Sequence, residues 1–269
     1  MWDVRNLSHL RAWVEYLPQE GGKRKLVLSV IEAFEKEVLP VAEGEGGREE
    51  GVGEEQQNDT GMEKAEKGEE GGKEEGSKTQ NKRKCFRQGV VMGDWNDANI
   101  IVDPLHPSLV LGAIDFGDSL WTWKINDVAI AMAYAAVSAF GKTHPVHAAA
   151  LLLRGFVSTA SSLPPSEARH LLILACARLS ISVTLGSFSF AQNPGNEYLL
   201  IHAQPAWSAL RTLWGGERGR VEEVLGRARE GGREGGVDVE GFWEELAGER
   251  FGLVGEEEWV ERCRREDEK

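Results

Sequence analysis

The apolar positions of this chain change their spacing between residues 89 and 114, where three short runs follow one another. Each run contains β-branched residues and is bounded by Gly, Asp, Asn or Pro, which is typical of strands separated by turns. The runs are Gly89–Met92, Ile100–Val102 and Leu109–Ile114. The spacer Asp103–Ser108 carries turn residues, so we predict that the last two runs form an antiparallel hairpin.

Helical spacing dominates the rest of the chain. The region from Lys23 to Phe34 carries one apolar stripe, formed by Leu26, Val27, Val30, Ile31 and Phe34. Residues Val128–Val137 are apolar on every side apart from the Tyr134 hydroxyl, which favours a buried helix. Further helices are predicted over Pro145–Ser161, Ser166–Phe190 and Tyr198–Trp214. The predicted fold class is therefore α+β and mostly helical, with a small β-hairpin.

Residues 42–84 follow neither pattern. They are almost wholly Glu, Gly, Lys, Gln and Asn, a composition that cannot bury enough apolar surface to offset the entropy of ordering. We predict a disordered insertion in a surface loop, where added length costs little free energy. An acidic interaction segment is the less favoured alternative. Beyond residue 215 the chain is charged again, with a short amphipathic helix predicted on the stripe Val239, Phe242, Trp243 and Leu246.

Charge and cysteine content exclude several classes of protein. The formal net charge of -13 at pH 7 argues against a basic surface for nucleic acid. No apolar stretch is predicted to be long and uncharged enough to span a membrane, and the N-terminal residues are not expected to form a signal peptide. The three cysteines are far apart, which disfavours disulfides and zinc and favours a cytoplasmic protein. His144 and His147 are assigned to a surface helix start rather than a metal pair. The oligomeric state is left open.

Polar residues at the ends of the predicted strands form one set. Asp94 follows the first strand, Asn99 opens the second, and Asp115 follows the third within Asp-Phe-Gly. Phosphoryl transfer needs a carboxylate that orients an attacking hydroxyl, and a carboxylate and an amide oxygen that hold Mg²⁺ beside the phosphates. A hairpin brings Asn99 and Asp115 to the same end. We therefore predict Asp94 as the catalytic base and Asn99 and Asp115 as metal ligands. Ordinary loop residues are the disfavoured alternative, because both motifs occur together.

These motifs support a resemblance to a known family. Gly-Asp-Trp-Asn-Asp-Ala-Asn-Ile at 93–100, with Ile-Asp-Phe-Gly-Asp at 114–118, resembles the catalytic and metal-binding loops of the aminoglycoside phosphotransferase superfamily, and within it most closely the hydroxylysine kinases. The similarity runs from Trp2 to about Trp214 around the insertion. It implies the large, C-terminal lobe of a protein-kinase-like fold. It also implies that Asp127 anchors the backbone of the catalytic loop.

The resemblance implies a reaction as well. A nucleotide γ-phosphate is transferred, with Mg²⁺, to the hydroxyl of a small amine-bearing metabolite; the expected pair is 5-hydroxy-L-lysine and GTP. ATP as donor, and choline, ethanolamine or another amino alcohol as acceptor, remain alternatives. Asp97 and Asp118 are candidates for facing a substrate amine, and Asp118 for assisting the metal. Solvated loop carboxylates are the alternative reading of both.

Two features depart from the family pattern. Met92 stands where the family usually has a histidine, and no Gly-rich phosphate loop or strand lysine precedes Asp94. We therefore expect a C-terminal lobe alone, and whether this chain is active by itself is left open. A truncated, non-catalytic binding module is the alternative from a different class. The expected organisation is a helical start (1–41), the insertion (42–84), the catalytic lobe (85–214) and a charged tail with short amphipathic helices (215–269).

Overall fold

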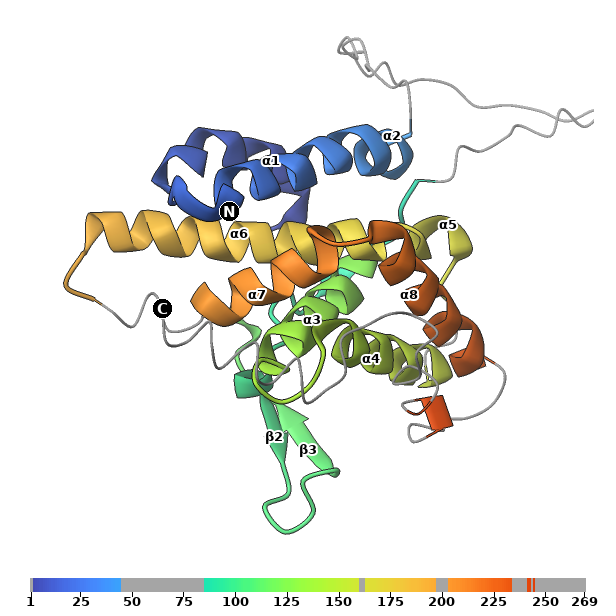
Figure 1. The fold of residues 1–269 in the computed structure, drawn as a ribbon. Coiled ribbons are helices and arrows are strands. Elements are labelled where there is room, and N and C mark those ends of the chain that lie inside the picture. The colour runs from blue at the N-terminus through green and yellow to red at the C-terminus, as the bar shows by residue number, and fades with distance from the viewer. Residues whose placement is uncertain are drawn as a thin grey trace, which may run out of the picture.

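Helix α6 (Leu171–Gln192) runs through the middle of the molecule, and other helices pack around it (Figure 1). The structure is a computed structural model that describes residues 2–44, 85–159, 163–196 and 203–233, together with 241, 242 and 244. Besides α6, its longer helical elements are η1 (Val4–Tyr16), α1 (Lys23–Ala33), α3 (Ile125–Ser138), α4 (Pro145–Thr159), α7 (Ala203–Trp214) and α8 (Arg218–Arg233). Helices η1 and α1 lie on one side of α6, α3 and α7 lie on the other, and α4 and α8 continue outward from α3. The prediction of a mostly helical fold is confirmed.

The hydrophobic core follows α6 because this helix is buried on every side. All residues from Leu171 to Ile181 are buried, and burying a Leu or Ile side chain stabilises the fold by roughly 1.5–3 kcal/mol. The predicted stripe on α1 supplies part of the cover. The chain enters α1 from a short 3₁₀ turn, η2 (Glu20–Gly22). After α1 it continues through a π-helical turn, η3 (Phe34–Val38), into α2 (Leu39–Ala42). The buried members of the stripe are Val27, Val30, Ile31 and Phe34.

Helix α6 corrects one expectation from the sequence. By length and composition alone it is long and apolar enough to cross a membrane, although no such stretch was expected. Within the protein, however, 72% of the relevant window is buried against other elements. A core helix that is covered on all sides has the same composition as a membrane span, because both replace water by apolar surroundings. The burial of α6 therefore accounts for its composition.

In the described part of the chain, four strands form two small antiparallel pairs. The predicted hairpin is confirmed: β2 (Ile100–Val102) pairs with β3 (Val110–Ala113), with Ile100 opposite Ala113. Strand β1 (Gln88–Val91) pairs instead with β4 (Leu120–Trp123), with Val91 opposite Leu120. The sequence analysis placed only helices after Asp115, so β4 corrects it. The partner of β4 lies about thirty residues earlier in the chain, and local periodicity carries no signal for such a pairing.

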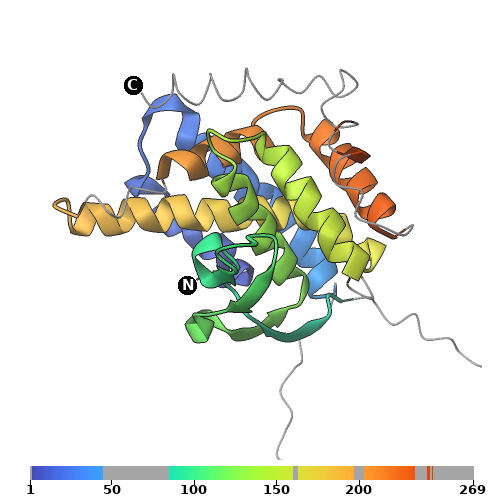
Figure 2. The same ribbon diagram turned by 90° about the horizontal axis from the view of Figure 1, so that it is seen from below.

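The β2–β3 hairpin projects away from the helices on the side of α6 opposite to α1 (Figure 1), so that it points toward the viewer when the molecule is seen from below (Figure 2). It exposes an unusual amount of apolar surface for its size. Its tip residue Leu105 is 83% exposed, and the neighbouring exposed side chains are Ile101, Leu109, Val110, Leu111, Ile114 and Phe116. We call this set the apolar hairpin face. Large exposed apolar side chains gathered on one small element are typical of places where proteins contact other molecules.

The helix predicted over Ser166–Phe190 is divided into α5 (Pro165–Ala168) and α6. The chain turns between them at Arg169–His170, and Glu167 of α5 is buried against the strand region. Its carboxylate accepts hydrogen bonds from the Arg87 amide, Nε and Nη2, each at 3.0 Å. This ion pair ties α5 to the start of β1, a tertiary contact that the helical pattern does not reveal.

Two other regions differ from the sequence analysis. The segment after residue 215 was expected to be a charged tail with short amphipathic helices, but no helix was predicted over Arg218–Arg233, where α8 lies and packs on α4. One face of α8 carries small apolar residues at i, i+3, i+4 and i+7 that join the core, namely Val221, Val224, Leu225 and Ala228. His144 and His147 are buried, at 4% and 3% exposure, and not on the surface.

Several predictions lie outside the described residues. They concern residues 45–84 of the insertion, the start of the helix at Tyr198, and most of the stripe around Val239. The described ends of the insertion nevertheless meet. The Phe86 amide donates to the Ala42 carbonyl at 3.3 Å, so the chain leaves the fold and returns to it at neighbouring points.

Candidate active site

Gly93 sets the distance between the Asp94 loop and the Asp-Phe-Gly turn. It has φ +81°, a left-handed conformation that favours glycine. A Cβ atom at this position would lie 2.6 Å from the carbonyl oxygen of Asp118 and 2.9 Å from Cδ2 of Leu120. A larger residue would therefore push the two segments apart. Glycine thus allows the end of β1 to pack directly against the backbone that follows the Asp-Phe-Gly turn.

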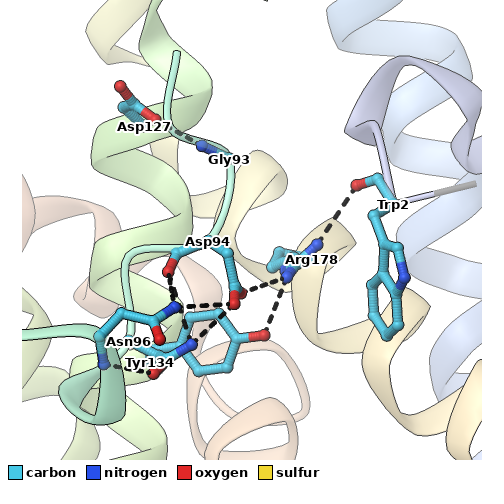
Figure 3. A network of polar contacts seen from close by, with 8 residues as sticks. Trp2, Gly93, Asp94, Asn96, Asp127, Tyr134 and Arg178 are labelled. Atoms are coloured by element: carbon cyan, nitrogen blue, oxygen red, sulfur yellow. Dashed lines mark hydrogen bonds and ion pairs between the residues drawn. The ribbon is translucent and has the colours of Figure 1, made fainter. Parts of the chain in front are cut away.

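Asp127, in the first turn of α3, holds the backbone just before Asp94. Its carboxylate accepts hydrogen bonds from the amides of Gly93 at 3.1 Å and Met92 at 3.3 Å (Figure 3). Burial raises the pKa of Asp127 above its ordinary value, and the hydrogen bonds from these amides oppose that shift. The contact is the one that the resemblance implies for Asp127. Because it uses the backbone amide at position 92, it does not depend on a histidine there.

The carboxylate of Asp94 is held from two sides. Its Oδ2 accepts hydrogen bonds from the side-chain amides of Asn96 at 2.8 Å and Asn99 at 3.1 Å. Its Oδ1 accepts from Nη2 of Arg178 at 2.8 Å (Figure 3). The Asp94 side chain is 18% exposed, so it is fixed by hydrogen bonds and still reachable from solvent. A carboxylate with this combination is suited to orient a hydroxyl group and accept its proton.

Asn99 ends a 3₁₀ turn, η4 (Asp97–Asn99), at the start of β2. Its side-chain nitrogen donates to Asp94, both to Oδ2 and to the main-chain carbonyl at 3.0 Å. The amide oxygen of Asn99 is therefore turned away from Asp94. The Asn99 carbonyl accepts from the Ile114 amide at 3.0 Å. The hairpin thus brings Asn99 beside the residue that precedes Asp115, as predicted.

Asp115 has φ 59° and ψ 65°, and it is the one non-glycine residue with positive φ in the described part of the chain. This conformation costs a non-glycine residue of order 1 kcal/mol, and such strain is concentrated at functional sites. Asp115 precedes the 3₁₀ turn η5 (Phe116–Asp118) and is exposed. Its carboxylate and the amide oxygen of Asn99 are the hard oxygen ligands that Mg²⁺ prefers.

The donor set therefore fits a magnesium ion of the kind that nucleotides carry. Mg²⁺ usually takes one or two protein oxygens and completes its shell with water and phosphate oxygens. Asn99 and Asp115 would supply two. Within the described ranges no group of three or more His, Cys, Asp or Glu is arranged to hold a metal ion.

The two remaining acidic candidates occupy different positions. Asp118 lines a pocket of about 370 Å³ that lies between the first residues of the chain and the Asp-Phe-Gly turn, and whose wall includes Trp2, Asp3, Gly93 and Asn126. Asp97 is exposed and is not among the residues that line this pocket. The structure thus brings Asp118, but not Asp97, to a cavity beside the site.

The sequence analysis missed Arg178, the partner of Asp94. The two residues are 84 positions apart, so no local motif joins them. A signal was nevertheless present, because Arg178 is the one charged residue in the 22 positions of α6. A lone charge in a buried helix needs a partner, since an unpaired buried charge is strongly destabilising.

The comparisons with known proteins first define a class. Residues 78–159 match the sequence model of the phosphotransferase enzyme family. This segment contains Asp94, Asn99, Asp115 and Asp127, so the residues that build the site lie within the matched region. The match supports a kinase-type enzyme. No solved structure matches the chain.

The similarity extends to particular proteins, the hydroxylysine kinases. The chain is 33% identical to hydroxylysine kinase of Mus musculus over 146 residues, which cover 52% of this chain and 38% of the relative. It is 32% identical to that of Xenopus laevis over 148 residues (52% and 38%) and 30% identical to that of Danio rerio over 132 residues (48% and 36%). The resemblance predicted from the sequence is confirmed. The chain spans less than two fifths of the length of these relatives.

Proposed function

We propose that this chain carries the catalytic base and metal ligands of a small-molecule kinase, within the large lobe of a protein-kinase-like fold. The observation that carries the proposal is the joint placement of Asp94 and Asn99. The carboxylate of Asp94 is fixed by hydrogen bonds and still reachable from solvent. The Asn99 side chain that helps to fix it donates through its nitrogen, which leaves the amide oxygen available as a metal ligand. In phosphoryl transfer the protein contributes mainly position and electrostatic stabilisation, which is what such an arrangement provides.

In the proposed mechanism Asp94 orients the acceptor hydroxyl and takes its proton. Asp127 keeps the loop backbone in place through the Met92 and Gly93 amides. Asn99 and Asp115 would hold Mg²⁺, which would supply charge neutralisation on the phosphates when bound. Gly93 lets the Asp94 loop pack directly against the backbone at the Asp-Phe-Gly turn, which keeps the two segments of the site close together.

The acceptor that we propose is 5-hydroxy-L-lysine, with GTP as donor, because the relatives named above are hydroxylysine kinases. The pocket beside the site supports an amine-bearing substrate through Asp118, which lines it, because a carboxylate attracts a cationic amine. Asp3 also lines the pocket, but its carboxylate is already paired with Arg5 at 2.7 Å. ATP as donor, or another amino alcohol such as choline or ethanolamine as acceptor, is the second candidate.

A radiolabelled phosphate-transfer assay tests the proposal. The recombinant chain is given GTP or ATP with 5-hydroxylysine, lysine, choline or ethanolamine. We expect transfer to 5-hydroxylysine and none to lysine, which lacks only the hydroxyl. Asp94→Asn should lower turnover by roughly two to four orders of magnitude, as is typical when a positioned base is lost, and leave magnesium–nucleotide binding unchanged in calorimetry.

Three outcomes would contradict the proposal. Near-normal turnover in Asp94→Asn would remove Asp94 from the mechanism. Transfer to choline or ethanolamine in place of 5-hydroxylysine would overturn the choice of acceptor but keep the reaction class. Magnesium–nucleotide binding without transfer to any acceptor would favour a non-catalytic binding module.

A further inference from the structure

Arg178 is a buried cation at the centre of a set of contacts that join four parts of the chain. Its side chain is 3% exposed. Besides Asp94, it donates from Nη2 to the Tyr134 hydroxyl at 2.9 Å and from Nη1 to the Trp2 carbonyl at 3.3 Å (Figure 3). The guanidinium also lies over two aromatic rings, 4.7 Å from the centre of Trp2 and 5.4 Å from that of Tyr134. Arg178 thus links α6, α3, the first residues of the chain and the Asp94 loop.

The Arg178–Asp94 ion pair is better explained by its effect on the orientation of the Asp94 carboxylate than by a gain in stability. Burying two charges costs several kcal/mol per ion, and their attraction roughly offsets that cost, so apolar residues in the same space often stabilise a fold equally well. The helix around Arg178 is otherwise apolar and buried. What an apolar residue could not do is fix the orientation of Asp94. A planar guanidinium holds its partners in a defined direction, because its donors form a rigid fork.

The contacts also distinguish the two oxygens of Asp94. Oδ2 accepts from two side-chain amides, those of Asn96 and Asn99, and a carboxylate oxygen has about two acceptor positions. Oδ1 accepts from Arg178. An incoming hydroxyl therefore meets Asp94 at Oδ1, the oxygen whose direction Arg178 sets.

We propose that Arg178 is a positioning residue that, held by Tyr134 and the Trp2 carbonyl, locks the Asp94 carboxylate so that Oδ1 faces the acceptor hydroxyl. This inference rests on the proposed kinase function for its catalytic consequence, but the positioning itself is a property of the fold. Arg178 is not a substrate contact. Its guanidinium is enclosed between two aromatic rings and almost without exposure, so it acts through Asp94.

The contacts predict different effects for three substitutions. Arg178→Met removes the fork, so Asp94 should rotate and kcat should fall about 10- to 100-fold, the scale expected when a reacting group is misplaced by about 1 Å; KM for the nucleotide should stay unchanged. Arg178→Lys keeps a charge that can reach Asp94 but cannot hold Tyr134 and Trp2 together, and it should restore part of kcat. Tyr134→Phe removes one hydroxyl that holds the guanidinium and should have the smallest effect.

A second readout is independent of turnover. The side-chain amides of Asn96 and Asn99 donate to Asp94, so their nitrogen–proton NMR signals report the orientation of its carboxylate. We expect these signals to move toward the positions of solvent-exposed amides in Arg178→Met and to recover partly in Arg178→Lys. Arg154→Met is the matched control. Arg154 of α4 also lies over an aromatic ring, Phe242 at 4.7 Å, but it is away from Asp94 and should leave the amide signals and kcat unchanged.

The outcomes separate this inference from the proposed function. If the wild-type chain transfers no phosphate, the kinase proposal fails, and displaced amide signals in Arg178→Met still support positioning. If Arg178→Met does not fold, the decision passes to Arg178→Lys and Tyr134→Phe, which change less volume. Native amide signals and wild-type kcat in both, with cooperative unfolding retained, would show that Arg178 only fills the core and would overturn the inference.

Discussion

Asp115 has a left-handed backbone conformation that few residues tolerate. A substitution that tests its role as a metal ligand must therefore keep this conformation. Asparagine is one of the few residues that tolerate the left-handed conformation well. Asp115→Asn therefore removes the charge and leaves the backbone geometry observed here, φ 59° and ψ 65°, accessible. A change of this kind separates the chemistry of a ligand from the stability of the turn that presents it.

We predict that Asp115→Asn raises the magnesium concentration needed for half-maximal nucleotide binding and turnover by roughly tenfold or more, because an anionic ligand beside the phosphates is lost. The measurement is a magnesium titration at saturating nucleotide, by calorimetry and by initial rate. Asp97→Asn is the matched control. It is the same substitution at an exposed position outside the pocket, and its curve should overlay that of the wild type. A deficit in Asp115→Asn that no magnesium concentration alters would speak against the metal role.

At this scale the sequence predicts the residues that share a local motif and misses those that meet through the fold. Asp94 and Asn99 are five positions apart, and Asp115 begins an Asp-Phe-Gly tripeptide. Phosphoryl transfer can therefore be predicted from the sequence alone. Arg178 and Tyr134 reach Asp94 from two different helices. Only the packing of α3 against α6 brings them together.

At the scale of elements, predictions succeeded where one period is repeated over many residues. Helix α1 and the β2–β3 hairpin follow from spacing and turn residues. Strand β4 was missed because its partner β1 is remote in sequence, and α8 was missed because a short apolar stripe is hidden in a composition dominated by Gly, Glu and Arg. The break between α5 and α6 reflects the buried Glu167–Arg87 pair, which no helical pattern encodes.

The two described ends of the insertion lie side by side, one at the end of α2 and the other just before β1. This arrangement predicts the effect of removing the insertion on stability. Because the Phe86 amide donates to the Ala42 carbonyl, a short linker can replace residues 45–84 without moving either element. Shortening the loop lowers the entropy of the unfolded chain, so the deleted protein should be as stable as the wild type or more stable by about 1–2 kcal/mol. Chemical denaturation measures the difference.

A control separates the length of the insertion from its composition. Replacing residues 45–84 by a Gly-Ser segment of the same 40 residues should leave the free energy of unfolding at the wild-type value. A clear loss of stability in both variants would show that the natural segment contributes packing. A loss in the short-linker variant alone would instead show that the connection is strained.

At the scale of the whole molecule, buried histidines couple folding to pH. His147 at the start of α4 is 3% exposed, and burial lowers its pKa from 6.5 to about 4. Burial also lowers the pKa of His170 to about 4. In the unfolded chain these groups take up protons below pH 6.5, whereas in the fold they stay neutral until about pH 4. Their contribution to stability is thus complete above pH 6.5 and is lost as pH falls toward 4.

We therefore predict that the melting temperature falls between pH 7 and pH 5, and that His147→Gln reduces this fall. The lowered pKa of His147 corresponds to a loss of order 1–2 kcal/mol at pH 5. The window lies above the range in which the ion-paired Glu35 and Glu37, whose pKa values are lowered by Arg11 and Arg218, take up protons. His106→Gln is the control, since His106 is exposed. Identical pH profiles for the wild type and His147→Gln would contradict the assignment.

The apolar hairpin face carries a practical consequence for every measurement on this protein. It lies next to the turn that holds Asp115, and its side chains are open to whatever is dissolved around them. Detergent, organic co-solvent and the protein itself at high concentration all compete for such a surface. An enzyme assay uses dilute protein and an NMR sample uses concentrated protein, so the hairpin is in contact with different molecules in the two experiments. Each measurement should therefore be repeated over a series of protein concentrations.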